Sequence, residues 1–495
     1  MLEKIIENTK EYISSMPKKE RKKYGQFFTS KSIAEYMAGS FCIPEDKKEI
    51  SILDAGAGTG ILSCALLERL EEYEHIEKID LTCYEIDEDV LEVLQLNLLY
   101  CKEKSKKIVE INIVKKNYIT SQELEFNNMI EREKTPAKYD LVIGNPPYKK
   151  IRKAAPEAQA MLSVCYGAPN LYSLFAAMGL FNLKDEGEMV YIVPRSWTSG
   201  VYFKKFREYF LSKGKLEQIH LFVSRDKIFD NEDVLQETMI IKVKKTQQIP
   251  ETVTITSSNT SNDFNNITSL EVNYNLVVSE KDKYVYLVTN EDEVNILNQI
   301  NKWNHTLPDM GLKMRTGLTV DFRNREFLRN EREEGSIPLF YSQHIKEGKI
   351  TFPIEKDNEY LVTEKNGLLQ ENKNYLFVKR FTSKEENRRL QCGIYLAKNY
   401  PEYEQISTQN KINFIESFIV EMSECLVYGL YVLFNSTLYD KYYRILNGST
   451  QVNATEINNM PVPDIGCIQK MGRKLMRSKD LSESNCDDIL EEYCG

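Results

Sequence analysis

Short apolar runs alternate with longer amphipathic stretches between residues 51 and 245. The runs with the length and composition of buried strands cover residues 51–55, 78–87, 111–119, 139–148, 187–194, 216–224 and 235–245. The stretches with helical periodicity cover residues 61–73, 89–100, 170–183 and 203–213. Parallel strands need crossover connections of this kind. The alternation therefore predicts an α/β fold with a doubly wound, mostly parallel sheet that binds its ligand at the carboxyl ends of the strands.

This alternation is lost in the second half of the chain. Residues 246–270 are rich in Thr, Ser and Asn, which indicates an edge strand and a linker region. A predicted helix over residues 291–303 is followed by short apolar runs with Gly and Pro turns. Because 495 residues are too many for one small core, we expect two domains, with a boundary between residues 285 and 286 and an α+β second domain.

Composition narrows the classes of protein that are possible. No apolar run approaches the ~20 residues of a membrane span, and the charged N-terminus lacks the apolar core of a signal peptide. We therefore expect a cytoplasmic protein without a membrane partner. Ten cysteines without a CxxC pair, and only four histidines, argue against a metal site and against a disulfide framework.

A glycine-rich loop, DAGAGTG, follows the first predicted strand from Asp54 to Gly60. Glycines at this place let the backbone turn tightly beneath a ligand. An acidic Asp54 repels a pyrophosphate but suits a cationic group, and Glu85 ends the second strand, where a carboxylate can accept from ribose hydroxyls. The two acids favour S-adenosylmethionine as the cofactor. The alternative, a dinucleotide, requires a GxGxxG spacing that this loop lacks.

The fourth predicted strand ends in Asn145-Pro-Pro-Tyr148. The prolines fix the backbone and can hold the side chains of Asn145 and Tyr148 in one geometry. An adenine amino nitrogen is a poor nucleophile, so two acceptors for its hydrogens would favour a more tetrahedral, reactive nitrogen. The Asn145 side-chain oxygen and the Pro146 carbonyl are the candidates, and Tyr148 can stack on the base. The alternative is a strand followed by a basic surface loop.

Several further motifs occur in a characteristic order. The set comprises GQFFTS (25–30), DAGAGTG, YEID (84–87), NPPY, NLYSLF (170–175), IVPRSW (192–197), FKKFREYF (203–210) and the later segment 433–464. This order resembles the gamma class of N6-adenine-specific DNA methyltransferases of type II restriction–modification systems. The resemblance implies a Rossmann-like methyltransferase catalytic domain over residues 1–285 and a target-recognition, DNA-binding domain over residues 286–495.

The resemblance also implies roles for the matching residues. Catalysis falls to Asn145, Pro146 and Tyr148, and cofactor binding to Thr29, Asp54, Gly56, Gly58, Glu85, Ile86, Asn117 and Tyr118. In the third strand the family usually has Asp-Phe, where this chain has Asn117-Tyr118, whose amide can still accept from the cofactor's adenine. Phe203 matches the aromatic that packs on the flipped target base opposite Tyr148. Periodicity alone equally describes Phe203 as a core residue of a helix.

A net charge of −9 conceals local cation-rich runs. The residues expected to contact double-stranded DNA are Lys149, Lys150, Arg323, Lys379, Arg380, Lys384, Arg388 and Arg389. We expect a monomer whose methylation protects DNA from a separate cognate restriction endonuclease.

Three alternatives remain open at this stage. Methyltransferases of RNA or of protein glutamine also use NPPY, although the long C-terminal region argues against a minimal glutamine enzyme. A sequence-specific DNA-binding regulator without catalysis is a second alternative, against which the intact motifs argue. A fused nuclease–methylase would need an extra domain, which the short segment before GQFFTS does not provide.

Overall fold

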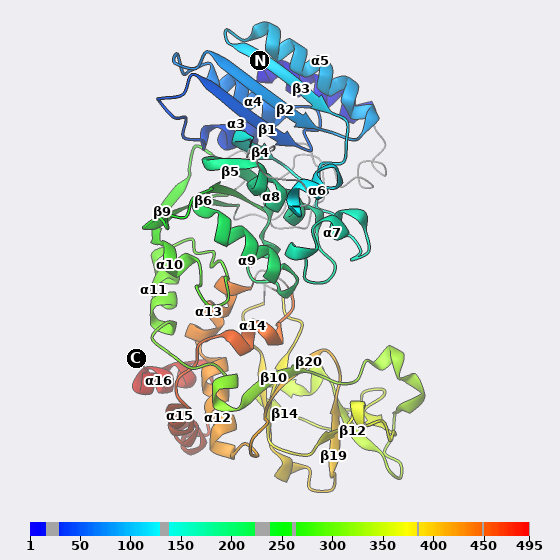
Figure 1. Ribbon diagram of the computed structural model, residues 1–495. Helices are drawn as coiled ribbons and strands as arrows, with labels where there is room; N and C mark the ends of the chain where they lie inside the picture. The colour runs from blue at the N-terminus through cyan, green and yellow to red at the C-terminus, as the bar shows by residue number, and fades with distance from the viewer. Residues whose placement is uncertain are drawn as a thin grey trace. The chain divides into compact units, whose positions relative to one another are not determined.

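The computed structural model describes residues 1–15, 29–128, 138–222, 238–259, 264–383, 386–447 and 450–494 (Figure 1). The chain divides into two compact units, Met1–Thr289 and Asn290–Gly495. The expected boundary after residue 285 lies close to this division. None of the described helices is long and apolar enough to cross a membrane.

A nine-stranded sheet in the order β3-β2-β1-β4-β5-β7-β6-β8-β9 forms the centre of the first unit. Its strands are β1 (Glu49–Ala55), β2 (Lys78–Tyr84), β3 (Ile108–Val114), β4 (Tyr139–Gly144), β5 (Leu183–Pro194), β6 (Lys215–Phe222), β7 (Thr238–Lys244), β8 (Thr252–Ser258) and β9 (Thr268–Asn273). The strands from β3 to β5 run parallel, whereas β7 is antiparallel to both of its neighbours. The predicted α/β fold with a mostly parallel sheet is confirmed.

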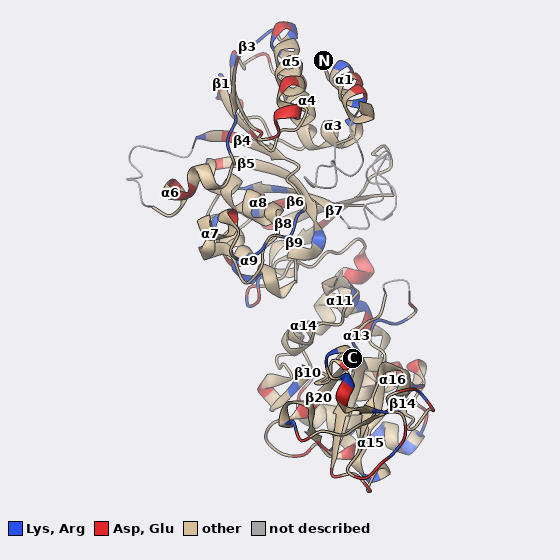
Figure 2. Cartoon of the chain, turned by 90° about the vertical axis from the view of Figure 1, so that its right-hand side faces the viewer, with Lys and Arg blue, Asp and Glu red and all other residues tan. Residues whose placement is uncertain are grey.

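Helices cover both faces of this sheet. On one face lie α1 (Leu2–Ser15), α3 (Lys31–Gly39), α4 (Ile61–Leu70) and α5 (Glu88–Lys104), which Figure 2 shows on the same side of β1 and β3. Helix α8 (Leu171–Asn182) packs on the other face. The unit also contains α6 (Glu123–Phe126), α7 (Pro156–Ala160), α9 (Lys204–Lys213) and α10 (Tyr274–Val277).

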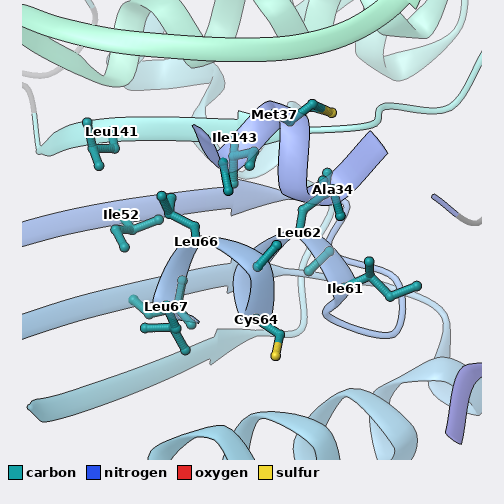
Figure 3. Close-up of a cluster of buried hydrophobic side chains, with 14 of the residues drawn as sticks. Ala34, Met37, Ile52, Ile61, Leu62, Cys64, Leu66, Leu67, Leu141 and Ile143 are labelled. Atoms are coloured by element: carbon teal, nitrogen blue, oxygen red, sulfur yellow. The ribbon is translucent and has the colours of Figure 1, made fainter. Parts of the chain in front are cut away.

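Alternation along β4 shows how one strand serves both layers. Leu141 and Ile143 are buried in the core beneath α4, as Figure 3 shows. Val142, between them, points to the opposite face, where a Cβ built on Gly179 of α8 would lie 3.4 Å from its side chain. Successive residues of a strand face opposite sides of a sheet, so a strand buried on both faces is apolar throughout.

Several bounds differ from the expectation: β2 and β4 end before the predicted residues 87 and 148, and β5 begins before residue 187. Two further segments differ in a way that the structure explains. Strand β3 ends at Val114, earlier than the predicted end at residue 119, because the Asn117 side chain accepts from the backbone N–H groups of Ile119 and Thr120 and turns the chain. Residues 246–270 supply β8 and the first part of β9, two strands instead of one edge strand and a linker.

The second unit combines two sheets with a set of helices. A six-stranded sheet in the order β10-β20-β17-β18-β14-β13 consists of β10 (Leu312–Thr316), β13 (Ile345–Lys346), β14 (Lys349–Ile350), β17 (Tyr375–Lys379), β18 (Cys392–Tyr395) and β20 (Ile412–Ser417). A five-stranded sheet in the order β11-β15-β12-β19-β16 consists of β11 (Leu328–Arg329), β12 (Ile337–Phe340), β15 (Tyr360–Leu361), β16 (Gln370–Glu371) and β19 (Gln405–Thr408). The helices are α11 (Glu291–Ile300), α12 (Glu424–Asn435), α13 (Thr437–Leu446), α14 (Ala454–Asn459), α15 (Ile465–Ser478) and α16 (Glu483–Cys494). This is the expected α+β class.

Helices α12 and α15 cross at close range through two glycines. A Cβ built at Gly429 would lie 1.8 Å from the carbonyl oxygen of Ile468, and one built at Gly472 would lie 1.8 Å from that of Cys425. Each carbonyl belongs to helix backbone and cannot rotate away as a side chain can. The crossing therefore admits only glycine at these two positions.

We expect Gly472→Ala to destabilise the second unit by about 1–3 kcal/mol or more, the usual cost of overpacking an interior. Chemical denaturation of the full chain, followed by circular dichroism, measures the change. Gly367→Ala is the matched control, because nothing lies within 4 Å of its built Cβ. Equal stability of the two variants would contradict a contact this close.

Candidate active site

Three predicted functional residues emerge together at the carboxyl edge of the parallel strands. The register sets Asp54 of β1 opposite Cys83 of β2 and Ile143 of β4. Glu85 and Asn145 each follow these partners by two residues. Neighbouring parallel strands end at one edge, so the carboxylates of Asp54 and Glu85 and the amide of Asn145 share one region of the sheet.

The glycine-rich loop is shaped by its backbone. Gly56, Gly58 and Gly60 have φ angles of +74°, +55° and +86°, a region that side chains with a Cβ rarely adopt. The N–H groups of Gly56 and Ala57 donate to the carbonyl of Tyr84 at 2.9 and 3.0 Å. The loop is thus tied to the end of β2, close to Glu85.

Asp54 is a buried carboxylate with one unsatisfied oxygen. Its side chain is 1% exposed, and Oδ2 accepts from the Ser63 hydroxyl at 2.7 Å. Oδ1 has no hydrogen-bond partner in the part of the chain that the structure describes. Burial raises the pKa of Asp54 to about 7, because a charged carboxylate loses its hydration there. Such an oxygen is suited to a cationic ligand group.

Glu85 is fixed by three backbone donors. Oε2 accepts from Gly58 N at 2.9 Å, and Oε1 accepts from Ile86 N at 2.8 Å and Asp87 N at 3.0 Å. Burial raises the pKa of this carboxyl, and the three donors oppose that rise. A carboxylate offers about four lone-pair sites, so acceptor capacity is left for a ligand. Ile86, beside it, is 57% exposed and presents an apolar surface at the edge of the site.

The Asn117-Tyr118 pair serves the protein's own structure. Asn117 Oδ1 accepts from Ile119 N at 3.0 Å and Thr120 N at 3.1 Å, so this acceptor already caps a turn. Tyr118 is 2% exposed, and its hydroxyl accepts from Asn182 at 3.1 Å. The contact of this pair with a cofactor's adenine stays a prediction.

The amide of Asn145 is held from both ends. Its Nδ2 donates to Thr29 Oγ1 at 3.1 Å, and its Oδ1 accepts from the Tyr148 hydroxyl at 3.0 Å. The same hydroxyl lies 3.1 Å from the carbonyl oxygen of Ile192, so one phenolic proton serves two acceptors. Pro146 between them is buried. Residues 25–28 of GQFFTS lie outside the described residues, and of the described remainder of the motif Thr29 bonds Asn145.

Tyr172, which the sequence analysis did not single out, lies between the two aromatics expected to stack on a base. Its ring meets that of Tyr148 edge-on at 6.2 Å and that of Phe203 at 5.6 Å with an interplanar angle of 30°. Phe203 is 7% exposed, so stacking on a base requires its surroundings to open. Its role stays a prediction. Tyr172 belongs to the NLYSLF motif, and its place there was the sequence signal that could have identified it as a site residue.

Known proteins similar to this chain identify its family. Residues 75–229 match the family of Eco57I restriction-modification methylases. The type II methyltransferase M.PstI of Providencia stuartii is 36% identical over 485 residues, which are 95% of this chain and 93% of that protein. M.BsuBI of Bacillus subtilis is 35% identical over 487 residues, 96% and 94% of the two chains. The chain belongs to the type II restriction–modification methyltransferases.

A solved structure shares the fold of this methyltransferase. The Type IIL restriction-modification enzyme MmeI, determined in complex with DNA, superposes with a TM-score of 0.53 over 96% of this chain and 73% of that one, at 12% identity. Among the residues described, no group of three His, Cys, Asp or Glu side chains is placed to hold a metal ion.

The cations expected to contact DNA differ in their accessibility. Lys149 and Lys150 are exposed directly after NPPY, and Lys150 Nζ lies 4.8 Å from the ring centre of Tyr202, itself 53% exposed. Arg323 in the second unit is also exposed. Lys379 and Arg380 are half-buried, and Lys384 lies outside the described residues.

Two adjacent arginines hold the fold of the second unit together. Arg389 is 0% exposed, its Nε donates to Thr382 Oγ1 at 3.2 Å, and its guanidinium lies 5.5 Å from the Tyr443 ring centre. The prediction that Arg389 contacts DNA is therefore wrong, because the group is enclosed by its own domain. Arg388 is 15% exposed and pairs with Glu483 at 2.8 Å, and its contact with DNA stays a prediction.

The pKa of Asp54 predicts a pH-dependent stability. With a folded-state value of about 7 against an ordinary value near ~3.9, the folded protein binds this proton more tightly than the unfolded chain. The Asp54 contribution to the free energy of unfolding is therefore largest at low pH and is lost as the pH rises towards 7. The Asp54→Asn variant has no titrating group at this position. Its free energy of unfolding, relative to that of the wild type, should therefore rise by up to about 4 kcal/mol from pH 4 to pH 8.

Denaturant titrations of cofactor-free protein at several pH values measure this difference. Asp185→Asn, which removes an exposed carboxylate, controls for the change of charge. A difference between wild type and Asp54→Asn that does not vary with pH would show that Asp54 titrates normally.

Proposed function

We propose that this methyltransferase transfers the methyl group of S-adenosylmethionine to the N6 nitrogen of an adenine flipped out of duplex DNA. The observation that carries the proposal is the clamped Asn145 amide at the same sheet edge as the unsatisfied Asp54 carboxylate. One group suits an amine nucleophile, and the other suits a cationic methyl donor. The family membership of the chain supports methyl transfer as the reaction.

The residues at the loop fit this cofactor. Asp54 Oδ1 is a buried acceptor that the cationic amino group of the cofactor's methionine part would satisfy. The same carboxylate would repel a pyrophosphate. Glu85 keeps lone pairs for ribose hydroxyls, and the exposed Ile86 offers an apolar face to an adenine ring. When bound, the sulfonium cofactor supplies an electrophilic methyl group.

On the nucleophile side, Asn145 Oδ1 and the Pro146 carbonyl would accept the two hydrogens of the adenine amine. Holding both hydrogens favours a tetrahedral nitrogen whose lone pair is available. No strong base is needed, since the amine becomes acidic once it is methylated and can then lose its proton. Thr29 and the Tyr148 hydroxyl orient the amide before the base arrives, which reduces reorganisation during the reaction.

The wider proposal concerns the two units. Unit Met1–Thr289 acts as the catalytic domain, and unit Asn290–Gly495 as the target-recognition domain that selects the DNA sequence. Flipping a base out of a duplex costs a few kcal/mol, which stacking on Tyr148, and on Phe203 once exposed, would offset. The monomeric enzyme would protect its sites from a separate cognate restriction endonuclease.

Asn145→Ala tests the chemistry directly. We expect single-turnover methyl transfer to unmodified DNA to fall by about 10²-fold or more, as for the loss of other preorganised polar contacts at a reacting centre. Affinity for S-adenosylmethionine and for DNA, and the melting temperature, should change little. Asn112→Ala, at an exposed position on β3, is the control. Sequencing of the product DNA would identify the methylated base.

Each other result assigns another function. Labelled methyl groups that appear in RNA or in protein glutamine, and not in DNA, would favour the alternative substrates. Tight binding of cofactor and DNA by the wild type without any transfer would favour a silent regulator. A folded Asn145→Ala protein that methylates adenine at the wild-type rate would end the catalytic assignment.

The exposed lysines after NPPY predict a salt-dependent contact. Replacing Lys149 and Lys150 by Gln should weaken DNA binding and lower the slope of log affinity against log salt by about one for each lost phosphate contact. Fluorescence anisotropy at several salt concentrations measures the slope. The double variant Lys102→Gln, Lys104→Gln, on the exposed end of α5, should keep the wild-type slope. An unchanged slope in the first variant would show that Lys149 and Lys150 are solvated surface residues that do not contact DNA phosphates.

A further inference from the structure

Helix α1 buries one polar side chain in an otherwise apolar stripe. The stripe consists of Leu2, Ile5 and Thr9, and the helix lies alongside α4 and α5 (Figure 2). Thr9 is 2% exposed, and its hydroxyl donates to the hydroxyl of Thr59 at 2.7 Å. Thr59 is also 2% exposed and belongs to the glycine-rich loop. The N-terminal helix therefore reaches the candidate cofactor site through one buried hydrogen bond.

A second polar contact grips the same residue of the loop. Asn97 of α5 is 1% exposed, and its Nδ2 donates to the Thr59 carbonyl at 2.8 Å. The Oδ1 of Asn97 accepts from Asn8 Nδ2 of α1 at 2.7 Å. The hydroxyl and the carbonyl of Thr59 are thus each held, and α1 contributes to both contacts.

Thr59 lies in a part of the glycine-rich loop that is flexible by composition. It stands between Gly58 and Gly60, which both have positive φ angles, and glycine is the residue with most backbone freedom to lose. Gly58 N–H in turn donates to Glu85 Oε2 at 2.9 Å. The loop has one internal backbone hydrogen bond, from Gly60 N to the Ala57 carbonyl at 2.9 Å, so contacts from outside add to the restraint on its glycines.

The end of α1 approaches the same carboxylates. Burial raises the pKa of the Tyr12 phenol, and the charges of Asp87, Asp89 and Glu85 raise it further. Tyr12 lies three residues after Thr9 on the same helix. Tyr12 therefore lies within electrostatic range of Glu85.

Simple stabilisation does not account for the buried hydroxyl pair. A net intramolecular hydrogen bond contributes about 0.5–1.5 kcal/mol, and two apolar side chains of similar shape can be as favourable. What the pair adds over an apolar contact is a fixed position for Thr59.

We propose that α1 is a positioning element of the cofactor site, in which Thr9, supported by Asn97 and Asn8, holds the glycine-rich loop in its binding conformation. The proposal rests on the proposed function, because the ligand is the S-adenosylmethionine assigned there. Thr9 acts through Thr59 and is a positioning residue that does not touch the ligand. Losing it should affect cofactor binding more than turnover at saturating cofactor.

Thr9→Val, which keeps the shape and removes the hydroxyl, is the test. We expect the Kd and KM for S-adenosylmethionine to rise about 2- to 13-fold, the range that corresponds to one net hydrogen bond. The kcat at saturating cofactor and the Kd for DNA should stay within about twofold. Calorimetry with S-adenosylmethionine and steady-state methylation of unmodified plasmid DNA give these constants. Thr9→Ser keeps the hydroxyl and should have the wild-type Kd, KM and kcat. Ser14→Ala, on the exposed side of α1, should also leave all three constants unchanged.

The outcomes separate this inference from the proposed function. A wild-type protein that does not bind S-adenosylmethionine overturns the proposed function. A wild type that binds it, with Thr9→Val binding equally well, overturns the positioning role alone. A loss of cofactor and DNA binding in proportion to the folded fraction also overturns it. If Thr9→Val does not fold, Asn8→Ala removes the outer contact instead, and an unchanged cofactor Kd in that variant is then the overturning result.

Discussion

Parallel pairing of β1 with β2 and β4 determines where Asp54, Glu85 and Asn145 of the candidate site lie. The three strands end at one edge, and their register aligns Asp54 with the residues two positions before Glu85 and Asn145. Side chains far apart in the sequence therefore converge because their strands pair. The glycine-rich loop, the Thr29–Asn145–Tyr148 hydrogen bonds and the contacts from α1 then adjust groups that the sheet has already brought together.

The sheet, and the convergence of strand-end residues at one of its edges, could be predicted because their signal is local and repeated. Apolar runs of strand length separated by amphipathic helices indicate parallel strands, and functional residues at the ends of such runs share one edge. The predicted ends of helices and strands were less accurate. Asn117 ends the predicted third strand early through two hydrogen bonds to backbone, and a side chain that competes with a strand ladder in this way is not visible in apolar periodicity.

The cation-rich run of the second unit shows what cannot be predicted from sequence alone. Arg388 and Arg389 stand in a run of cations, yet Arg389 is enclosed by Thr382 and Tyr443 and has no exposed surface. A count of charges does not distinguish a cation aimed at a partner from one that holds its own domain together, because that depends on residues distant in the chain. The same reason hid Tyr172, whose contacts with Tyr148 and Phe203 join three separate segments.

In the proposed cofactor site, the buried carboxyl of Asp54 would place a proton and the cationic ligand in competition for the same group. Because burial raises the pKa of this carboxyl to about 7, acid would protonate it and so weaken its attraction for the proposed cofactor. The same protonation stabilises the fold. Acid would therefore empty the site of a cationic ligand while this residue adds to the stability of the domain around it, so occupancy and folding respond to pH in opposite directions.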